Sequence, residues 1–257
     1  MHKPAGAKWR GRPLSAVLFD LDGTLLDTVA DIALALNRTL LEYGRNPLAE
    51  SDVRRMIGRG SPILIERAAA AQGRAIDGPT QAAMLERFFH HYGELEESNE
   101  DRARPYPGAA EGLQAVHDAG LRTAVVTNKQ HRFADALLKR LSLAGWVDMV
   151  VGGDTCARRK PDPQPLLFAC ESLHTRPSEC LMVGDSVNDV QAARAAFIPV
   201  VCVSYGYNEG RDPRTLDCDV LLDSLADLPA LLELPRPTAA RRSGPRSPAG
   251  AARTRRQ

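Results

Sequence analysis

Two carboxylates, Asp20 and Asp22, follow an apolar run in the stretch VLFDLDGTLLDT at residues 17–28. A short apolar run of this kind is typical of a buried strand, so two like charges stand where a strand ends. Such charges repel each other unless a cation is held among them. Oxygen ligands without His or Cys are the ligands that Mg²⁺ prefers in proteins. The pair therefore predicts a magnesium site at the end of this strand.

Polar side chains also stand at the ends of later apolar runs. In chain order they are Thr127, Asn128, Lys160, Asp185 and Asp189. A strand-end Asp is often only the cap of the next helix, but four strand ends with acids, a hydroxyl and a lysine are harder to explain in that way. A cation beside a lysine and hydroxyl donors would neutralise a phosphoryl group during transfer. One aspartate could then attack phosphorus as a nucleophile.

Five short apolar runs must position these side chains. The runs are continuous rather than alternating, which is typical of strands buried on both faces. They lie at 16–20, 122–127, 148–154, 180–185 and 199–206. Helical patterns separate the runs after residue 104, so the sequence predicts a doubly wound parallel α/β sheet. In such a sheet the ligand crevice lies beyond the carboxyl ends of the strands.

Residues 27–104 interrupt the alternation, because they contain helical patterns and no convincing strand. We expect a helical cap over 27–104 that closes over the crevice as a lid. The α/β core would then consist of 1–26 and 105–234. Residues 235–257 hold seven Arg and no acid, and their Pro, Gly, Ser and Ala content predicts a disordered tail.

Charge and composition exclude some classes of protein. The 257 residues carry a net charge of +1, which becomes −6 without the seven tail arginines, and such a body is no evident nucleic-acid binder. Binding of a nucleic acid or protein partner through the tail, without magnesium, stays an alternative.

No apolar stretch approaches the ~20 residues of a membrane span, and no signal peptide is visible. The five Cys form no CxxC pair, so we expect free thiols and a cytoplasmic protein.

The strand-end residues resemble the four motifs of the haloacid dehalogenase superfamily of phosphotransferases. DLDGT at 20–24, Thr127, Lys160 and GDSVND at 184–189 occur in the order of those motifs. The likeness covers roughly residues 14–234. It implies an α/β core with an inserted cap, a Mg²⁺ cofactor and an aspartyl-phosphate intermediate.

The resemblance also implies catalytic roles. Asp20 would be the nucleophile. Asp22 would protonate the leaving alkoxide and then act as the base that activates water. Thr127 would hold a phosphoryl oxygen, with Asn128 beside it. An Asp two residues after the nucleophile favours a phosphatase or phosphomutase, because haloacid dehalogenases lack it and P-type ATPases carry Thr there.

A metal site is implied in the same way. The Asp20 carboxylate, the backbone carbonyl of Asp22 and the Asp185 carboxylate would bind Mg²⁺, with Asp189 in support. Lys160 would balance the charge of Asp20 and of the phosphate.

Longer stretches resemble bacterial phosphoglycolate phosphatases, among them YPGAAEGL, AVVTNK, KPDPQPLL and LMVGDSVNDVQAARAA. This resemblance implies hydrolysis of 2-phosphoglycolate, a small phosphorylated metabolite. β-Phosphoglucomutases, the nearest rivals, carry a His five residues after the hinge Asp, whereas here Asp27 is followed at that position by Ile32. A phosphatase for pyrophosphate or a sugar phosphate stays open. Phe197 departs from the pattern, since a Gly usually stands there.

Arg59 is a candidate for binding the carboxylate of such a substrate. It lies between two glycines in GRG at 58–60, which joins two expected cap helices. The segment could be a flexible turn with a solvated Arg, or a finger that reaches the site and pairs with a carboxylate. Arg54, Arg55 and Arg67 are rivals for that role. The sequence leaves the natural substrate and the oligomeric state open.

Overall fold

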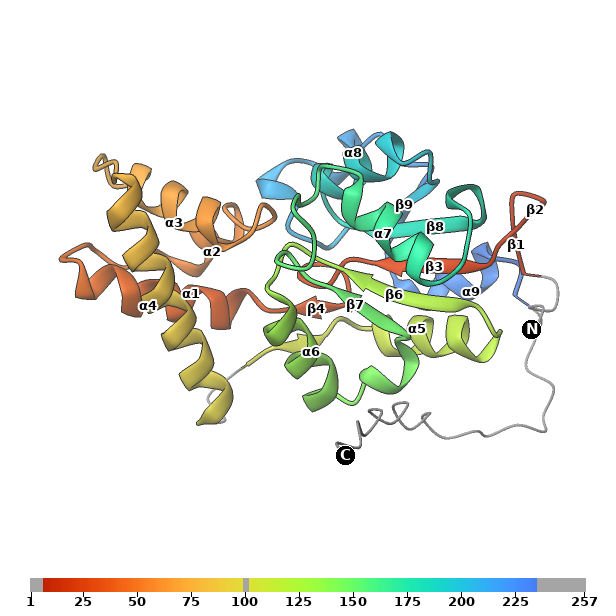
Figure 1. Cartoon of the computed structure of the whole chain (residues 1–257), viewed down its shortest axis with the longest axis horizontal. Coiled ribbons are helices and arrows are strands. Elements are labelled where there is room, and N and C mark those ends of the chain that lie inside the picture. The colour runs from red at the N-terminus through yellow and green to blue at the C-terminus, as the bar shows by residue number, and fades with distance from the viewer. Residues whose placement is uncertain (1–6, 99–101, 235–257) are drawn as a thin grey trace, which may run out of the picture.

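A six-stranded parallel sheet runs through the protein, and helices pack on both of its faces (Figure 1). The computed structural model describes residues 7–98 and 102–234, so the tail predicted at 235–257 lies outside the described residues. In order across the sheet, the strands are β10 (Val220–Leu222), β9 (Val200–Val203), β8 (Cys180–Gly184), β3 (Ala16–Phe19), β6 (Arg122–Val126) and β7 (Met149–Val151).

The direction of winding reverses at β3, which pairs in parallel with β8 on one side and with β6 on the other. At such a switch point, the loops that leave the strands separate and open a crevice beyond the carboxyl ends. The doubly wound parallel fold predicted from the sequence is therefore confirmed. It brings the ends of β3, β6 and β8 to the same crevice.

Both faces of the sheet are buried, which explains why the apolar runs are continuous. In β3, Val17 and Phe19 pack into one cluster of buried side chains, with α5 and α6. Ala16 and Leu18 pack into a second cluster on the other face, with α7 and α8. Successive residues of a strand point to opposite faces, so a strand covered on both sides must be apolar at every position.

The edge strand β10 was missed by the sequence analysis. It has only three residues, VLL, two of which are partly exposed, and it pairs with β9 alone. A run this short between Asp219 and Asp223 gives too weak a signal to be distinguished from a loop. The run expected at 148–154 is also longer than the strand that it contains.

Four helices and several short turns connect the strands of the sheet, and a fifth helix, α9, follows β10. The helices are α5 (Ala109–Asp118), α6 (His131–Arg140), α7 (Gln164–Ser172), α8 (Val187–Ala195) and α9 (Leu228–Leu231). The 3₁₀ turns are η1 (Ala144–Trp146), η2 (Pro177–Glu179), η3 (Asn208–Gly210), η4 (Pro213–Thr215) and η5 (Leu225–Asp227). A short hairpin, β1 (Lys8–Trp9) and β2 (Arg12–Pro13), precedes the sheet.

Four further helices, which we call the cap helices, lie together at one end of the molecule (Figure 1). They are α1 (Val29–Glu42), α2 (Glu50–Arg54), α3 (Ser61–Ala70) and α4 (Gly78–Glu97). Residues Val29, Ile32, Leu36 and Leu40 recur at helical spacing along α1, and all four are buried in a cluster built mainly by the cap helices.

Two short strands join the cap helices to the rest of the chain. These strands, β4 (Leu26–Asp27) and β5 (Arg104–Pro105), pair antiparallel. Because β4 precedes the cap helices and β5 follows them, the pair ties the two connections together.

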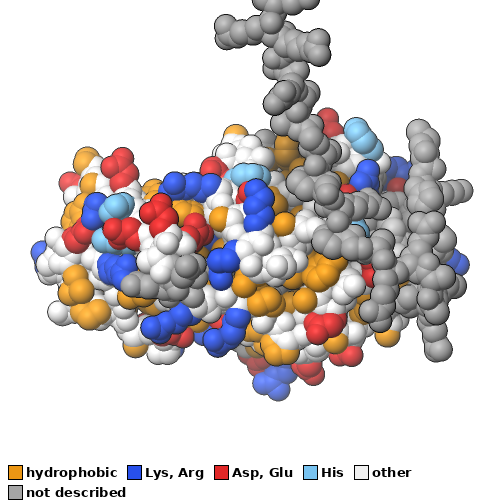
Figure 2. Space-filling view, turned by 90° about the horizontal axis from the view of Figure 1, so that it is seen from below, with side chains coloured by type: hydrophobic (Ala, Val, Ile, Leu, Met, Phe, Trp, Pro, Cys, Tyr) orange, Lys and Arg blue, Asp and Glu red, His pale blue; other side chains and the backbone are white. Residues whose placement is uncertain are grey.

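Among the described residues, no helix combines the length and the apolar character needed to cross a membrane. On the face shown in Figure 2, Lys and Arg side chains are interspersed with Asp and Glu.

Phe197 follows the end of α8 in the left-handed region, with φ of 58°, and is 88% exposed. Glycine is the usual residue at this position of a helix end, because a side chain there costs about 1–2 kcal/mol. We therefore expect Phe197→Gly to raise the free energy of unfolding by up to about 1 kcal/mol, since part of the gain is offset by the greater freedom of Gly in the unfolded chain. Urea unfolding measures the change.

The matched control is Phe197→Ala, which removes the exposed ring but keeps the strained backbone. It should give no comparable gain. A Phe197→Gly protein that is less stable than the wild type would show that the ring makes contacts that stabilise the fold.

Candidate active site

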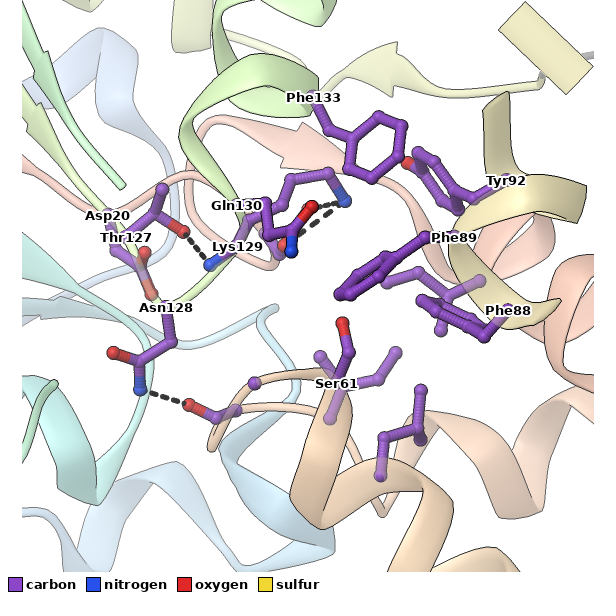
Figure 3. A pocket seen from close by; sticks show the side chains of 16 residues that line it. Asp20, Ser61, Phe88, Phe89, Tyr92, Thr127, Asn128, Lys129, Gln130 and Phe133 are labelled. Carbon is purple, nitrogen blue, oxygen red and sulfur yellow. Dashed lines mark hydrogen bonds and ion pairs between the residues drawn. The ribbon is translucent and has the colours of Figure 1, made fainter. Parts of the chain in front are cut away.

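The predicted catalytic and metal-binding residues meet at the carboxyl end of the sheet. Asp20 follows β3, Thr127 follows β6 and Asp185 follows β8, while Lys160 comes from the loop between β7 and α7. Asp20 and Thr127 line a pocket that extends to the cap helices (Figure 3). The shared edge of the parallel strands thus brings together residues up to 165 positions apart in the sequence.

Three buried carboxylates form the floor of the site. Asp20, Asp185 and Asp189 each place an oxygen within 4.8 Å of those of the other two. The Lys160 ammonium lies between two of them, 2.9 Å from Asp20 Oδ1 and 2.6 Å from Asp189 Oδ1. One ammonium does not balance three carboxylates, so the floor carries an excess of negative charge. An all-oxygen donor set of this kind fits a hard divalent cation.

Burial governs the protonation of this cluster. It raises the pKa of Asp20 well above its ordinary value, although the Lys160 charge opposes the shift. Burial, together with the Asp189 charge, raises the pKa of Asp185 to about 7. Burial lowers the pKa of Lys160, but the charges of Asp189 and Asp20 outweigh it and raise that pKa to about 12. A cation would favour the charged carboxylates and offset their cost of desolvation.

Asp185 is held in one orientation by its neighbours. Thr24 Oγ1 donates to Asp185 Oδ1 at 3.0 Å, and the backbone N–H of Tyr207 donates to Asp185 Oδ2 at 2.7 Å. Gly206 makes this packing possible, because a Cβ there would lie 2.1 Å from the Asp185 Cβ. Gly184 likewise leaves room for the Asp189 side chain, since a Cβ on residue 184 would lie 2.4 Å from the Asp189 Cγ.

Asp189 has two structural partners. Its Oδ2 accepts hydrogen bonds from Ser186 Oγ at 2.7 Å and from the Ser186 backbone N–H at 3.1 Å, which completes a capping box at the start of α8. Its Oδ1 accepts from Lys160 at 2.6 Å. The helix cap that the sequence offered as the simpler explanation is therefore present, and the same carboxylate also belongs to the acidic cluster.

Asp22 faces a different set of partners from Asp20. Thr28 Oγ1 donates to Asp22 Oδ1 at 2.7 Å, and Lys129 Nζ lies 3.2 Å from the same oxygen. Asp20 instead accepts a hydrogen bond at Oδ1 from the Leu21 backbone N–H at 2.7 Å. The two carboxylates both line the pocket but have separate supports, which is the arrangement expected of groups with different roles.

Thr127 and Asn128 both line the pocket. Thr127 is buried, and its Oγ1 accepts a hydrogen bond from the Lys129 backbone N–H at 3.2 Å. Asn128 Nδ2 donates to the Gly58 carbonyl at 2.8 Å and to the Lys160 carbonyl at 2.9 Å, so its amide ties a cap loop to the core. Its Oδ1 is buried without a hydrogen-bond partner among the described residues, which leaves an acceptor free.

Arg59 lies apart from the other predicted site residues. Its side chain is 43% exposed and its Nε donates to Glu209 Oε1 at 2.9 Å. Its neighbours Gly58 and Gly60 line the pocket, but Arg59 itself does not. Arg67 binds the same Glu209 oxygen at 3.0 Å. In this arrangement the guanidinium of Arg59 is engaged by a carboxylate of the protein.

The other two arginine rivals are also engaged outside the pocket. Arg54 donates to the Tyr205 carbonyl at 3.0 Å and stacks on the Tyr207 ring at 4.7 Å. Arg55 pairs with Asp52.

Lys129 is a charged residue of the pocket that the sequence analysis missed. It lines the pocket and is only 7% exposed, and it contacts Asp22 across 107 positions of sequence. The available signal was its position directly after Thr127 and Asn128, at the end of a strand that already carried two polar residues. Its side chain could equally have been a solvated loop charge, and no spacing rule links it to Asp22.

The wall of the pocket opposite the catalytic residues is apolar. It comes mainly from α1, α3, α4 and the segment after α2, with one residue from α6. These residues are Ile32, Ile57, Leu64, Phe88, Phe89, Tyr92 and Phe133. Figure 3 shows the aromatic rings facing the strand-end residues across the pocket. The pocket is therefore polar toward the sheet and apolar toward the cap helices.

The sequence is similar to a family of hydrolases and to individual phosphatases over most of its length. A family model described as haloacid dehalogenase-like hydrolase matches residues 17–203. A phosphoglycolate phosphatase of Nitrosospira multiformis is 44% identical over 222 residues, which cover 86% of this chain and 96% of that protein. A phosphoglycolate phosphatase of Rhodospirillum rubrum is 45% identical over 227 residues, 86% of this chain and 92% of that protein.

A solved structure is also similar along most of its length. The crystal structure of a predicted phosphoglycolate phosphatase from Haemophilus somnus superimposes with a TM-score of 0.79 at 30% sequence identity. The match covers 85% of this chain and 97% of the other. The shared region includes both the sheet and the cap helices.

Proposed function

Because the chain belongs to the haloacid dehalogenase-like hydrolase family and is a phosphoric monoester hydrolase, we propose that it hydrolyses 2-phosphoglycolate to glycolate and phosphate in a Mg²⁺-dependent reaction. We propose that the reaction passes through an aspartyl phosphate on Asp20. The observation that carries the mechanism is the buried acidic cluster with Lys160 in contact with Asp20, which lines the same pocket as Asp22.

Asp20 is suited to the role of nucleophile. Its Oδ1 is held by the Leu21 N–H and by Lys160, so Oδ2 is the oxygen that would attack phosphorus. The Lys160 charge favours the ionised carboxylate and would also neutralise the incoming phosphate. Thr127 would bind a phosphoryl oxygen, and Asn128 would lie beside it.

Asp22 would protonate the leaving oxygen and then remove a proton from the attacking water. Thr28 and Lys129 fix its carboxylate at the edge of the pocket, away from the acidic cluster. A general acid and base must lie close to the proton that it moves, so this fixed position matters.

The residues present fit a Mg²⁺ ion. We propose that the carboxylates of Asp20 and Asp185 and the backbone carbonyl of Asp22 hold it, with Asp189 in support. When bound, the ion would neutralise charge on the phosphoryl oxygens and on the carboxylates.

Mg²⁺ should therefore raise the melting temperature, and more strongly at pH 8 than at pH 6. The pKa of Asp185 is raised to about 7, so its ionisation makes the metal-free fold less stable as the pH rises from about 4 through 7. The cation offsets that loss only when the carboxylate is charged. At a hundred times Kd we expect about 2.7 kcal/mol, or roughly 5–10 °C.

Thermal unfolding in EDTA and in MgCl₂, with NaCl at equal ionic strength as the control, measures this effect. Asp185→Asn should remove it. An equal rise in melting temperature at both pH values, or one that survives in Asp185→Asn, would place the ion elsewhere.

We also propose that residues 27–104 act as a cap domain that closes over the pocket during the reaction. The pairing of β4 with β5 and the separate apolar cluster of the cap helices support this division. The predicted carboxylate-binding role of Arg59 would require its ion pair with Glu209 to break on closure. A cytoplasmic location stays a prediction, with which the five free thiols are compatible.

A phosphate-release screen tests the proposed function. The full-length protein is given 2-phosphoglycolate, ethyl phosphate, β-glucose 1-phosphate and pyrophosphate, with and without Mg²⁺. We expect the highest kcat/KM for 2-phosphoglycolate, and no turnover in EDTA. Preference for another phosphate would overturn the substrate assignment. A phosphomutase would release little free phosphate and would require a sugar bisphosphate.

A further inference from the structure

The pocket contains one cationic side chain among the described residues that line it, and this is Lys129. Lys160 lies beneath the pocket floor and is engaged by two carboxylates. Arg59 is outside the lining and is paired with Glu209. A substrate anion other than the phosphate therefore has a single fixed positive charge available to it inside the pocket.

The Lys129 ammonium is anchored but retains donor capacity. Its Nζ lies 3.2 and 3.5 Å from the two oxygens of Asp22, and 4.5 Å from the centroid of the Tyr92 ring. The 3.5 Å contact is at the limit of a hydrogen bond, so an incoming carboxylate can replace it at one of the three N–H donors of the ammonium. Burial lowers the pKa of Lys129, but the Asp22 charge and the Tyr92 side chain together outweigh it and raise that pKa above its ordinary value. The group is thus a permanent cation at the edge of the pocket.

The chemistry of the substrate places its carboxylate near this cation. In 2-phosphoglycolate, one carbon separates the ester oxygen from the carboxylate. Asp22 must contact that ester oxygen to protonate it, and Lys129 contacts Asp22. The carboxylate can therefore come within hydrogen-bond distance of Lys129 when the phosphate is on Asp20.

The apolar side of the pocket cannot serve as an alternative. Phe88, Phe89 and Phe133 line its far side together with aliphatic residues of the cap helices. An unpaired carboxylate against such a wall would be strongly destabilised. The apolar wall thus leaves the polar side of the pocket for the anion, where Ser61, Asn128 and Gln130 are neutral and Lys129 is the cation.

We propose that Lys129 binds the carboxylate of the substrate and so determines the preference for 2-phosphoglycolate, an inference that rests on the function proposed above. Asp22 then has two roles. It orients the Lys129 ammonium before the substrate binds, and it transfers a proton to the ester oxygen beside the bound carboxylate. Specificity and proton transfer are coupled through this one contact.

The test compares kcat/KM for 2-phosphoglycolate with kcat/KM for ethyl phosphate, which has the same number of carbons and no carboxylate. In Lys129→Met the ratio of the two constants should fall by about 10- to 100-fold, the loss expected for a hydrogen bond between charged groups. Ethyl phosphate can lose activity as well, because Asp22 loses a support, but the loss must be smaller. Lys139→Met, at an exposed position on α6, is the matched control and should leave the ratio unchanged.

The outcomes separate the two proposals. An equal loss on both substrates, or no loss, in a folded Lys129→Met protein would show that Lys129 serves only Asp22 and would overturn the inference. If Lys129→Met does not fold by circular dichroism, Lys129→Gln gives the same comparison with the charge removed and donors kept. A wild type that does not favour 2-phosphoglycolate over ethyl phosphate would overturn the proposed substrate itself, and the inference with it.

Discussion

Asp20→Asn is expected to abolish turnover, with kcat at least about 10⁴-fold below that of the wild type, as for the loss of other catalytic nucleophiles. The amide keeps the shape of the carboxylate but has no anionic oxygen that can attack phosphorus. The fold should survive, because the substitution removes one of three neighbouring buried carboxylates. Steady-state phosphate release and thermal unfolding measure the two effects.

Asp118→Asn is the matched control, since this carboxylate is exposed at the end of α5. It should retain wild-type turnover. Substantial phosphatase activity in a well-folded Asp20→Asn protein would mean that another group attacks phosphorus.

Asp22→Asn should lower kcat by about 10²–10⁴-fold, the usual contribution of general acid–base catalysis. Both steps should suffer, because an amide neither protonates the leaving oxygen nor takes a proton from water. The variant should also be less stable by about 3–5 kcal/mol, since it leaves the buried ammonium of Lys129 without its counter-ion. Phosphate release and urea unfolding provide the measurements.

A double variant separates the catalytic role of Asp22 from its structural one. Asp22→Asn combined with Lys129→Met removes the unpaired charge, so it should regain most of the lost stability but none of the lost activity. Wild-type turnover in Asp22→Asn alone would contradict the assigned role of this residue.

The sheet could be predicted because the apolar pattern of each strand is contained in a few consecutive residues. Strands covered on both faces must be apolar at each position, and such runs can be recognised without knowledge of their neighbours. The edge strand β10 has only one neighbour and three residues, two of them partly exposed, so its sequence carries no comparable signal. The side chains predicted at the ends of β3, β6 and β8 lie together because parallel strands all end at the same edge.

The contacts that depend on tertiary folding could not be predicted. Glu209 engages Arg59 across 150 positions, and Lys129 reaches Asp22 across 107. A lysine in a loop and an arginine between two glycines look alike in sequence, because both are ordinary surface residues until a partner is brought to them. Only the fold shows that the lysine faces the pocket and that the arginine is held outside it.

The central claim, that Asp20 carries a phosphoryl group during the reaction, is tested most directly by trapping the intermediate. Wild type and Asp22→Asn are mixed with 2-phosphoglycolate and Mg²⁺, quenched in acid within one turnover and treated with borohydride, which reduces an aspartyl phosphate to homoserine. Peptide mass spectrometry should find homoserine at position 20 in both proteins and at no other Asp. Full turnover with residue 20 unchanged, or a modified residue elsewhere, would contradict the account.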